Sequence, residues 1–563
     1  MEKGEEAVEG GWPMRPWLMA AVGGVAGLIF WFLVDMPIAP DLPPIRQAAA
    51  AFVIVATLSF LITADRERLV WATAFAVTWG AIIGMIGFYT ATYNFHGEIV
   101  EFPFLSALLA VGIAGPLFQV VRDQGRAALP YAPLHRYVWD DAIIGAASFV
   151  FTGLTFLLTF LLAELFDAIG IGIFSDLLGE GWFDWMLAGT AFGAASAILR
   201  EREPLLGTLQ RLVTVVISVL APVLAGALVM FLVALPATGF AGLWKSGVPE
   251  TPLLLAAAAF AFVFLNAIIG GSSDERGKGR LWRWTEIGLL AAVLPLGVLA
   301  LISMSMRVDQ YGWTPERLWG VIACAVAIAF GIANWTALAL DRSNFDVRLR
   351  DYQKKLAVGV CGLALLLAMP ILDFGAISTR SQLAKLESGK ISADKFDWAA
   401  LKYDFGPAGR AALDRFAISG TGDEKKLALQ TKQLESRYEI GRAVEAEERA
   451  EKLETYVDVA SPDIVLTEGL RRNIANMRNC GAYMRCKLFR LDEHRLILLT
   501  AGGVPATFDR LILDERKFDG VVEKTYPQAD ARQLDMKQVQ IEVRHVPTKQ
   551  VFVNGQPVGQ PFE

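Results

Sequence analysis

Long apolar runs fill most of the first two-thirds of the chain. A helix needs about 20 mainly apolar residues to cross the hydrocarbon core of a bilayer. Eleven runs approach or exceed that length, at residues 17–34, 47–64, 69–93, 102–121, 142–163, 183–199, 212–235, 253–271, 285–304, 318–340 and 356–371. The pattern predicts an α-helical polytopic membrane protein, with a tail over residues 1–16 and a bundle of about 11 transmembrane helices over residues 17–371.

The chain becomes polar after residue 371. The last 192 residues hold 29 of the 52 Lys and Arg residues. We expect a mainly helical segment over 372–484, in which 423–455 forms a charged surface helix or helical hairpin that is either solvated or bound by a partner. A small β-rich module over 485–563 follows, with strands predicted at 488–490, 495–499, 539–543 and 551–553, the last before an Asn554-Gly555 turn. Together these segments predict a C-terminal extracytoplasmic α+β domain.

Composition narrows the class of protein. With 563 residues, 54% of them hydrophobic, and a net charge of −6, the chain is neither disordered nor collagen-like. The first apolar run follows an acidic lead with only Lys3 and Arg15 as cations, whereas a cleavable signal peptide has a basic lead. We therefore interpret this run as a retained first span. We expect no nucleic-acid partner.

The loops between the apolar runs differ strongly in Lys and Arg content. If the N-terminal tail defines one side of the membrane, that side has 19 cationic residues before position 372, and the opposite side has four, Arg46, Lys245, Arg307 and Arg317. Lys and Arg accumulate in cytoplasmic loops. The asymmetry predicts a bacterial inner-membrane protein with a cytoplasmic N-terminus, and an odd number of spans then makes the C-terminal domain periplasmic.

The cysteines allow a second argument about location. Cys324 and Cys361 lie inside apolar runs and are interpreted as small core residues. Cys480 and Cys486 are the pair in the polar region. Disulfides persist in oxidising compartments, so a local disulfide is the preferred interpretation and two free thiols are the alternative. A metal site is not predicted, because zinc prefers four N or S ligands and only His494 is near in sequence.

Small residues and buried polar residues recur within the apolar runs. Gly80 and Gly84 have the spacing of a close helix–helix contact. Polar side chains at membrane depth are costly and mark candidate intramembrane sites, here Glu164, Asp167, Asn266 and Asn334. These four residues have two interpretations: an ion or proton site, or acids at the water interface with asparagines that bond across helices. The apolar, acidic stretch 163–178 predicts an amphipathic interfacial or re-entrant segment.

The segment Tyr311–Arg317 also has two interpretations. Thr314, Pro315 and Glu316 are typical of a helix start, with a capping hydroxyl, a first-turn proline and a first-turn acid. Alternatively, Arg307 and Arg317 are two of the four cations on their side of the membrane, and form a candidate site for a lipid phosphate or another anion.

Several motifs resemble a known family when read in order. They are Trp139 with Asp141, Phe151-Thr152-Gly153, Leu161 to Phe166, Ile169-Gly170-Ile171, Leu235-Pro236, Leu243 to Gly247, Leu265-Asn266-Ala267 and Tyr311 to Arg317. Over roughly residues 50 to 420 the chain resembles bacterial multi-pass membrane proteins that are grouped only as a domain of unknown function. Ala163 departs from the pattern, which has an aromatic residue there. The resemblance implies an inner-membrane protein with many spans and no particular activity.

The sequence lacks the motifs of common catalytic sites. It has no phosphate-binding loop, no G-x-S-x-G elbow and no H-E-x-x-H pair, and its four histidines, His96, His135, His494 and His545, are far apart. We therefore expect no cofactor, leave catalytic residues unassigned, and favour a non-catalytic membrane protein that contacts lipids and binds an envelope protein through its C-terminal domain. The alternatives are a transporter of a small solute or lipid, and an enzyme for a lipid-linked substrate that uses Glu164 or Asp167.

Overall fold

The computed structural model describes most of the first 433 residues and parts of the remainder. The described residues are 12–35, 42–92, 98–125, 129–239, 249–277, 279–342, 344–433, 453–460, 464, 466, 470–471, 474, 480, 485–490, 495–500, 505–509, 549–553 and 556–562. They form two compact units, Met1–Leu429 and Gln430–Glu563.

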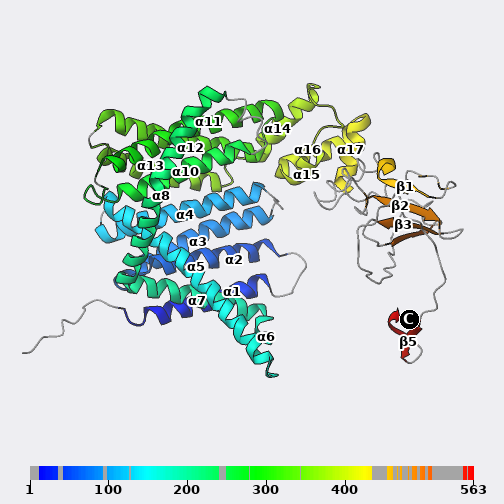
Figure 1. The fold of residues 1–563 in the computed structure, drawn as a ribbon, viewed down its shortest axis with the longest axis horizontal. Coiled ribbons are helices and arrows are strands. Elements are labelled where there is room, and N and C mark those ends of the chain that lie inside the picture. The colour runs from blue at the N-terminus through cyan, green and yellow to red at the C-terminus, as the bar shows by residue number, and fades with distance from the viewer. Residues whose placement is uncertain are drawn as a thin grey trace, which may run out of the picture. The chain divides into compact units, whose positions relative to one another are not determined.

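Long helices make up most of the first unit (Figure 1). They are α1 (Arg15–Val34), α2 (Pro44–Thr63), α3 (Leu69–Thr92), α4 (Glu98–Gln124), α5 (Tyr131–Asp167), α7 (Gly181–Glu201), α8 (Glu203–Thr238), α10 (Glu250–Ile269), α11 (Arg280–Tyr311), α12 (Pro315–Leu340) and α13 (Phe345–Ala368). Each of the eleven predicted runs falls on one of these helices. A 3-10 turn, η1 (Arg66–Arg68), and a six-residue helix, α6 (Ile173–Leu178), complete the bundle.

Within the described residues, nine of the eleven helices that contain predicted spans are long and apolar enough to cross a membrane. The other two, α7 and α13, are less apolar. Asp184 and many small residues lower the hydropathy of α7. The first half of α13 has six charged residues, so the apolar part of this helix is shorter than the run of about 20 residues that crosses the hydrocarbon core.

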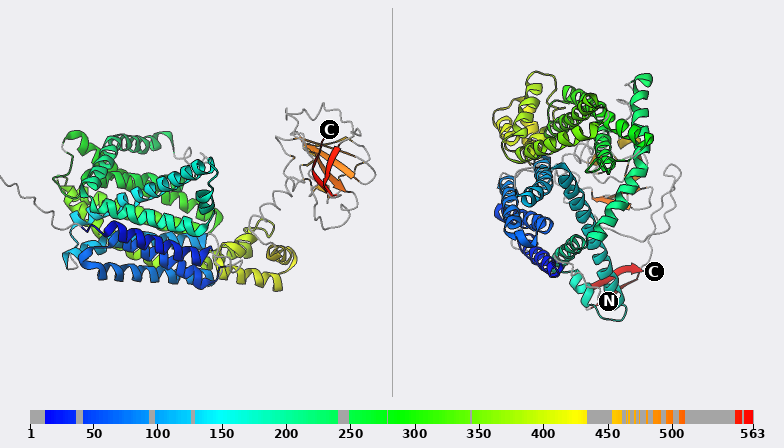
Figure 2. Two further views of the ribbon diagram at one scale, coloured as in Figure 1. Left: turned by 90° about the horizontal axis from the view of Figure 1, so that it is seen from below. Right: turned by 90° about the vertical axis from the view of Figure 1, so that its left-hand side faces the viewer.

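The helices of the first unit pack side by side, as the end-on view in Figure 2 also shows. One buried core lies between α1, α2 and α7, another between α2, α3, α4 and α13, and the largest between α8, α10, α11, α12 and α13. Gly80 and Gly84 of α3 do pack closely against α2, where a Cβ atom on Gly80 would lie 2.9 Å from that of Ala56. Such small residues let helix backbones approach in lipid.

The stretch 163–178 continues α5 to Asp167 before turning. Gly170 has a φ of 81°, a conformation that favours glycine, and allows the turn into α6. The rings of Phe166 and Phe174 lie 5.0 Å apart across this turn. The predicted interfacial segment is therefore the end of one long helix plus a short one.

Four shorter helices follow the bundle within the residues after 371. They are α14 (Phe374–Glu387), α15 (Trp398–Tyr403), α16 (Gly406–Ser419) and α17 (Gly422–Gln433). Their own core includes Trp398, Leu401 and Phe416. These helices belong to the first compact unit with the bundle, except that the end of α17 lies in the second unit. The boundaries at 371 and 484 stay predictions. Of the predicted surface helix over 423–455, residues 434–452 lie outside the described residues.

The second unit contains the predicted strands that the structure describes. A turn, η2 (Leu453–Thr455), leads into a four-stranded sheet in the order β1 (Val457–Val459), β2 (Cys486–Arg490), β3 (Arg495–Thr500) and β4 (Pro505–Asp509). The β1–β2 pair is parallel, and the other pairs are antiparallel. The hairpin of β5 (Lys549–Val553) and β6 (Gln556–Phe562) is also present, whereas the strand predicted at 539–543 lies outside the described residues.

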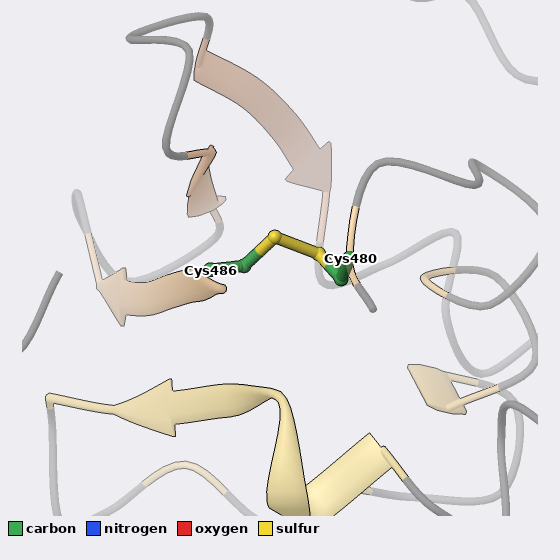
Figure 3. Close-up of a disulfide and its surroundings, with 2 residues drawn as sticks. All are labelled: Cys480 and Cys486. Atoms are coloured by element: carbon green, nitrogen blue, oxygen red, sulfur yellow. A yellow bond between two sulfur atoms is a disulfide. The ribbon is translucent and has the colours of Figure 1, made fainter. Parts of the chain in front are cut away.

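The predicted disulfide is confirmed. Cys480 and Cys486 are joined by an S–S bond of 2.03 Å beside the sheet (Figure 3). Both cysteines are buried in the small core of this unit with Val457, Leu488 and Leu498. Cys324 is a buried free thiol in the helical bundle, as predicted, whereas the free thiol of Cys361 is only half-buried.

Candidate functional site

A buried ionic cluster fixes the loop between α10 and α11. Arg276 of this loop donates from Nε to both carboxylate oxygens of Glu286, at 3.0 and 2.9 Å. Its Nη1 lies 3.1 Å from a carboxylate oxygen of Asp346, the second residue of α13. Glu286 and Asp346 are only 1% and 2% exposed. Buried carboxylates need charged partners, and hydrogen bonding to Glu286 raises the pKa of Arg276.

A second arginine completes this cluster. Arg350, one turn after Asp346, donates to its carboxylate at 2.8 Å and to the carbonyl of Ile269 at 2.9 Å. Ser273 donates to the same carboxylate at 2.8 Å. Two arginines and two acids thus balance in charge, and they tie the end of α10, the loop and the start of α13 together.

A layer of polar side chains lies next to the cluster. The hydroxyl of Tyr131, at the start of α5, lies 3.0 Å from Oδ1 of Asn266 and 2.8 Å from Oε1 of Gln353. One hydroxyl donates one hydrogen, so only one of these contacts is a hydrogen bond at a time. The layer joins α5, α10 and α13 through uncharged groups.

His135 lies between a donor and an acceptor in this region. The indole Nε1 of Trp139, which only donates, lies 3.1 Å from the His135 Nε2. The carbonyl of Asn266, which only accepts, lies 3.2 Å from the same Nε2. The tautomer of the ring decides which of these two hydrogen bonds forms.

A pocket of about 580 Å³ opens beside these residues, and we call it the polar pocket. Its volume is in the range of small-molecule sites. Its polar lining comes from α5, α8 and the α10–α11 loop, namely His135, Arg136, Trp139, Gln210, Thr214 and Glu275. Glu275 is held in place because its Oε2 accepts from the backbone nitrogen of Gly271 at 2.7 Å.

A second, apolar groove of about 520 Å³ lies between α4, α10, α12 and α13, and we call it the α12 groove. Leu255, Phe262, Ala323, Phe330 and Leu363 are among its lining residues, and Ser106 is a polar one. The hydroxyl of Ser106 is already used, because it donates to the carbonyl of Ala364 at 2.9 Å. This groove offers dispersion contacts and very little hydrogen bonding.

The structure separates the four candidate intramembrane residues. Asn266 joins the polar layer, and its Nδ2 donates to its own helix at Phe262. Asn334 is fully buried and donates from Nδ2 to the carbonyl of Leu290 on α11 at 3.3 Å. Both asparagines thus have partners on neighbouring helices.

Glu164 and Asp167 lie elsewhere, on the exposed end of α5. Asp167 accepts a hydrogen bond from Ser175 of α6 at 3.0 Å. The structure therefore brings neither acid to Asn266 or to the polar pocket.

Arg307 and Arg317 each have an internal partner. Nη2 of Arg307 lies 2.7 Å from a carboxylate oxygen of Glu250, the first residue of α10. Arg317 donates from Nη1 to the carbonyl of Gly312 at 2.6 Å, and its guanidinium lies over the ring of Tyr311. The predicted anion site remains a prediction, with both cations already engaged.

The Tyr311–Arg317 segment is a helix start, as predicted, and also a docking point. α12 begins at Pro315, with the hydroxyl of Thr314 accepting from the backbone nitrogen of Arg317. The amide of Gln382 on α14 donates to the carbonyls of Tyr311 and Trp313 at 2.9 and 3.0 Å. The motif thereby attaches α14 to the bundle, a role that its sequence does not indicate.

Among the residues that the structure describes, no three His, Cys, Asp or Glu side chains lie close enough together to hold a metal ion. His494 and His545 lie outside the described residues. The sequence analysis did not predict the buried cluster, which consists of Arg276, Glu286, Asp346 and Arg350. The sequence feature that could have indicated it is the presence of charged residues next to apolar runs.

Comparison with known families identifies the relationship suggested by the motifs. A model of the family described as Domain of unknown function (DUF4153) matches residues 49–416. The chain belongs to this family. The match covers the bundle from α2 onward and the helices through most of α16, including the polar pocket and the α12 groove. No curated protein and no solved structure matches the DUF4153 chain.

Proposed function

We propose that this DUF4153 protein is a non-catalytic protein of a bacterial inner membrane, whose bundle holds the unit Gln430–Glu563 on the periplasmic side, where that unit binds a protein of the envelope. The observation that carries the proposal is the Cys480–Cys486 disulfide, which lies beyond the last apolar helix. Disulfides persist in oxidising compartments and are rare in the cytosol.

The contacts between loops support the orientation. The tail residue Arg15 donates to the carbonyl of Ala64, and Arg122 donates to that of Thr63 at 2.5 Å. These contacts join three segments that the charge count assigns to one side. A similar contact between Arg276 and Asp346 joins the two loops of that side nearest the C-terminus. Cationic loops gathered at one end of a bundle are typical of the cytoplasmic side.

Reporter fusions test the orientation. Alkaline phosphatase is active only after export and green fluorescent protein only in the cytosol, so both are fused at Glu563. Matched fusions after Gly125 and after Gly170, on opposite predicted sides, serve as controls. We expect phosphatase activity at Glu563 and Gly170 and fluorescence at Gly125. Fluorescence at Glu563 would overturn the orientation and remove the argument from the disulfide.

Partner binding is tested separately. Cells expressing the full chain or a chain that ends after Gln433 are treated with a cross-linker, and the products are identified by mass spectrometry. We expect an envelope protein that cross-links to the full chain and not to the shortened one. The same cross-linked proteins with both chains would exclude the second unit as the binding element.

A second function, lipid transport, is favoured by the α12 groove. Its lining is apolar and it lies among helices that are able to span a membrane, so a lipid chain suits it and a polar solute does not. Reconstituted protein is tested for the transfer of a fluorescent phospholipid between leaflets. Ala323→Trp fills the groove, whereas Ala325→Trp, two residues away and not lining it, is the control. Equal transfer rates for the two variants would remove this candidate.

A further inference from the structure

The polar pocket continues into an apolar groove along α8. Gln210 and Thr214 line both the polar pocket and an open groove of about 580 Å³, which we call the α8 groove. Gln210, Thr214, Ser218 and Pro222 are four residues apart and therefore lie on one face of α8. Leu281 and Trp282, at the start of α11, form the other wall.

The two spaces differ in chemistry. Charged and hydrogen-bonding groups line the polar pocket, whereas Val215, Val219, Leu281 and Trp282 line the α8 groove. A polar end joined to an apolar channel, at the end of membrane-spanning helices, matches an amphiphile better than a solute or a protein segment.

Two arginines flank the junction. Arg136 lines the polar pocket and Arg211 lines the α8 groove, and both side chains are exposed. Neither forms an ion pair with a carboxylate in the described part of the chain. They contrast with Arg200 and Arg276, whose charges are paired with acids at 2.6 and 2.5 Å. Two acids lie in the same region, because Glu275 lines the polar pocket and the carboxylate of Asp140 accepts from Gln210. Unlike the acids beside Arg200 and Arg276, neither forms an ion pair with Arg136 or Arg211.

We propose that α5, α8 and the start of α11 form a binding site for a membrane phospholipid, with its phosphate between Arg136 and Arg211 and an acyl chain in the α8 groove. Arginine binds phosphate through several N–H groups, and the hydroxyl of Thr214 supplies a further donor. The site goes beyond the proposed envelope function and does not depend on the orientation of the chain.

Native mass spectrometry of the full chain in detergent tests the lipid class. Dioleoyl phosphatidylglycerol, dioleoyl phosphatidylethanolamine, dioleoylglycerol and inorganic phosphate are titrated separately. We expect either phospholipid to bind on the order of tenfold or more tightly than dioleoylglycerol, since hydrogen bonds to a charged group are lost without the phosphate. Equal binding of dioleoylglycerol, or of inorganic phosphate, would overturn the proposal.

Variants at the arginines test the headgroup contact. Arg136→Gln with Arg211→Gln should weaken phospholipid binding about tenfold or more, and the double substitution to Lys should retain most of it. Arg66→Gln with Arg348→Gln is the matched control, because these two exposed arginines lie on the same predicted side and line neither space. Equal loss in both double Gln variants would show bulk attraction to charge and overturn the site.

A tryptophan scan tests the acyl-chain contact. Val219→Trp fills the α8 groove, whereas Val216→Trp lies on the same helix outside its lining. We expect Val219→Trp alone to weaken binding of dioleoyl phosphatidylglycerol. Binding of dihexanoyl phosphatidylglycerol, which has the same headgroup and short acyl chains, should be unaffected. If the two tryptophan variants bind the long-chain lipid equally, no acyl chain occupies the groove. Gel filtration and circular dichroism of each variant confirm that it folds.

Discussion

Gly23 of α1 and Gly189 of α7 meet backbone to backbone: a Cβ atom added to either residue would overlap the carbonyl oxygen of the other. Gly27 meets Trp185 and Gly193 meets Met19 in the same way. Each helix thus has two glycines four residues apart, the spacing of close helix pairs in membranes. At the ends of the pair, Arg15 lies 3.6 Å from Glu201, and Trp185 donates to Asp35 at 3.2 Å.

Substitution at this contact should destabilise the bundle. Gly189→Ala inserts a methyl group where no space exists, so we expect a loss of about 1–3 kcal/mol in the free energy of unfolding. Gly153→Ala is the control, because a Cβ there meets no atom within 4 Å and alanine favours the helix. Thermal unfolding in detergent measures both, and equal melting temperatures would contradict the close contact.

The buried ionic cluster should be more sensitive than the ion pairs on the surface. Glu286→Gln removes the charge that pairs with Arg276, and an uncompensated buried charge costs about 3–5 kcal/mol. Asp351→Asn is the control, since Asp351 pairs with Lys354 and Lys355 on an exposed face of α13 and exposed pairs contribute little. A similar drop in melting temperature for both variants would show that the Glu286 pair is not buried in solution.

The disulfide predicts how many cysteine thiols react with maleimide. Denatured protein purified without reductant should react with two equivalents of maleimide, at Cys324 and Cys361, and with four after reduction. Four equivalents before reduction would contradict the bond. Cys480→Ser with Cys486→Ser should cost the second unit about 2 kcal/mol, the value expected for a short loop. Cys361→Ser, which removes a free thiol, is the control.

Local sequence patterns predicted the helices well, because an apolar run of sufficient length indicates a membrane helix without reference to the rest of the chain. The run at 356–371 shows the limit of this reasoning. Its apolar residues were recognised, yet α13 begins at Phe345, since Asp346 pairs with Arg276 and Arg350 donates to the carbonyl of Ile269, both from other parts of the chain. α7 is weakly apolar because of its small residues, and those residues belong to the bundle through their close contact with α1. A contact of this kind with another part of the chain is not visible in the local pattern.

The candidate site depended on contacts between distant residues, which periodicity does not reveal. Arg276, Glu286 and Asp346 come from a loop and two helices, and nothing in their spacing joins them. Asn266 was recognised because a polar residue inside an apolar run is visible locally, whereas its partner Tyr131 was not. Gly80 was noticed for its spacing, and the tighter pair Gly23 and Gly189 lies on helices far apart in sequence.

The docking of α14 leads to the last prediction. Gly312 ends α11 with a φ of 80°, which favours glycine, and a Cβ there would lie 2.9 Å from Nε2 of Gln382. Gly312→Ala should therefore cost about 1–3 kcal/mol and loosen α14 from the bundle. Lys385 should lose its contacts to the carbonyls of Asp309 and Gln310 at the same time. Limited proteolysis would detect this as earlier cleavage within α14–α17.

Gly389→Ala separates the two causes of that effect. Gly389 also has a positive φ, of 69°, but a Cβ there meets no atom within 4 Å. It therefore reports the backbone cost alone. We expect Gly312→Ala to lower the melting temperature more than Gly389→Ala, and Gln382→Ala to speed the cleavage without changing the backbone. If all three variants resist protease as the native chain does, the Tyr311–Trp313 turn is not what holds α14.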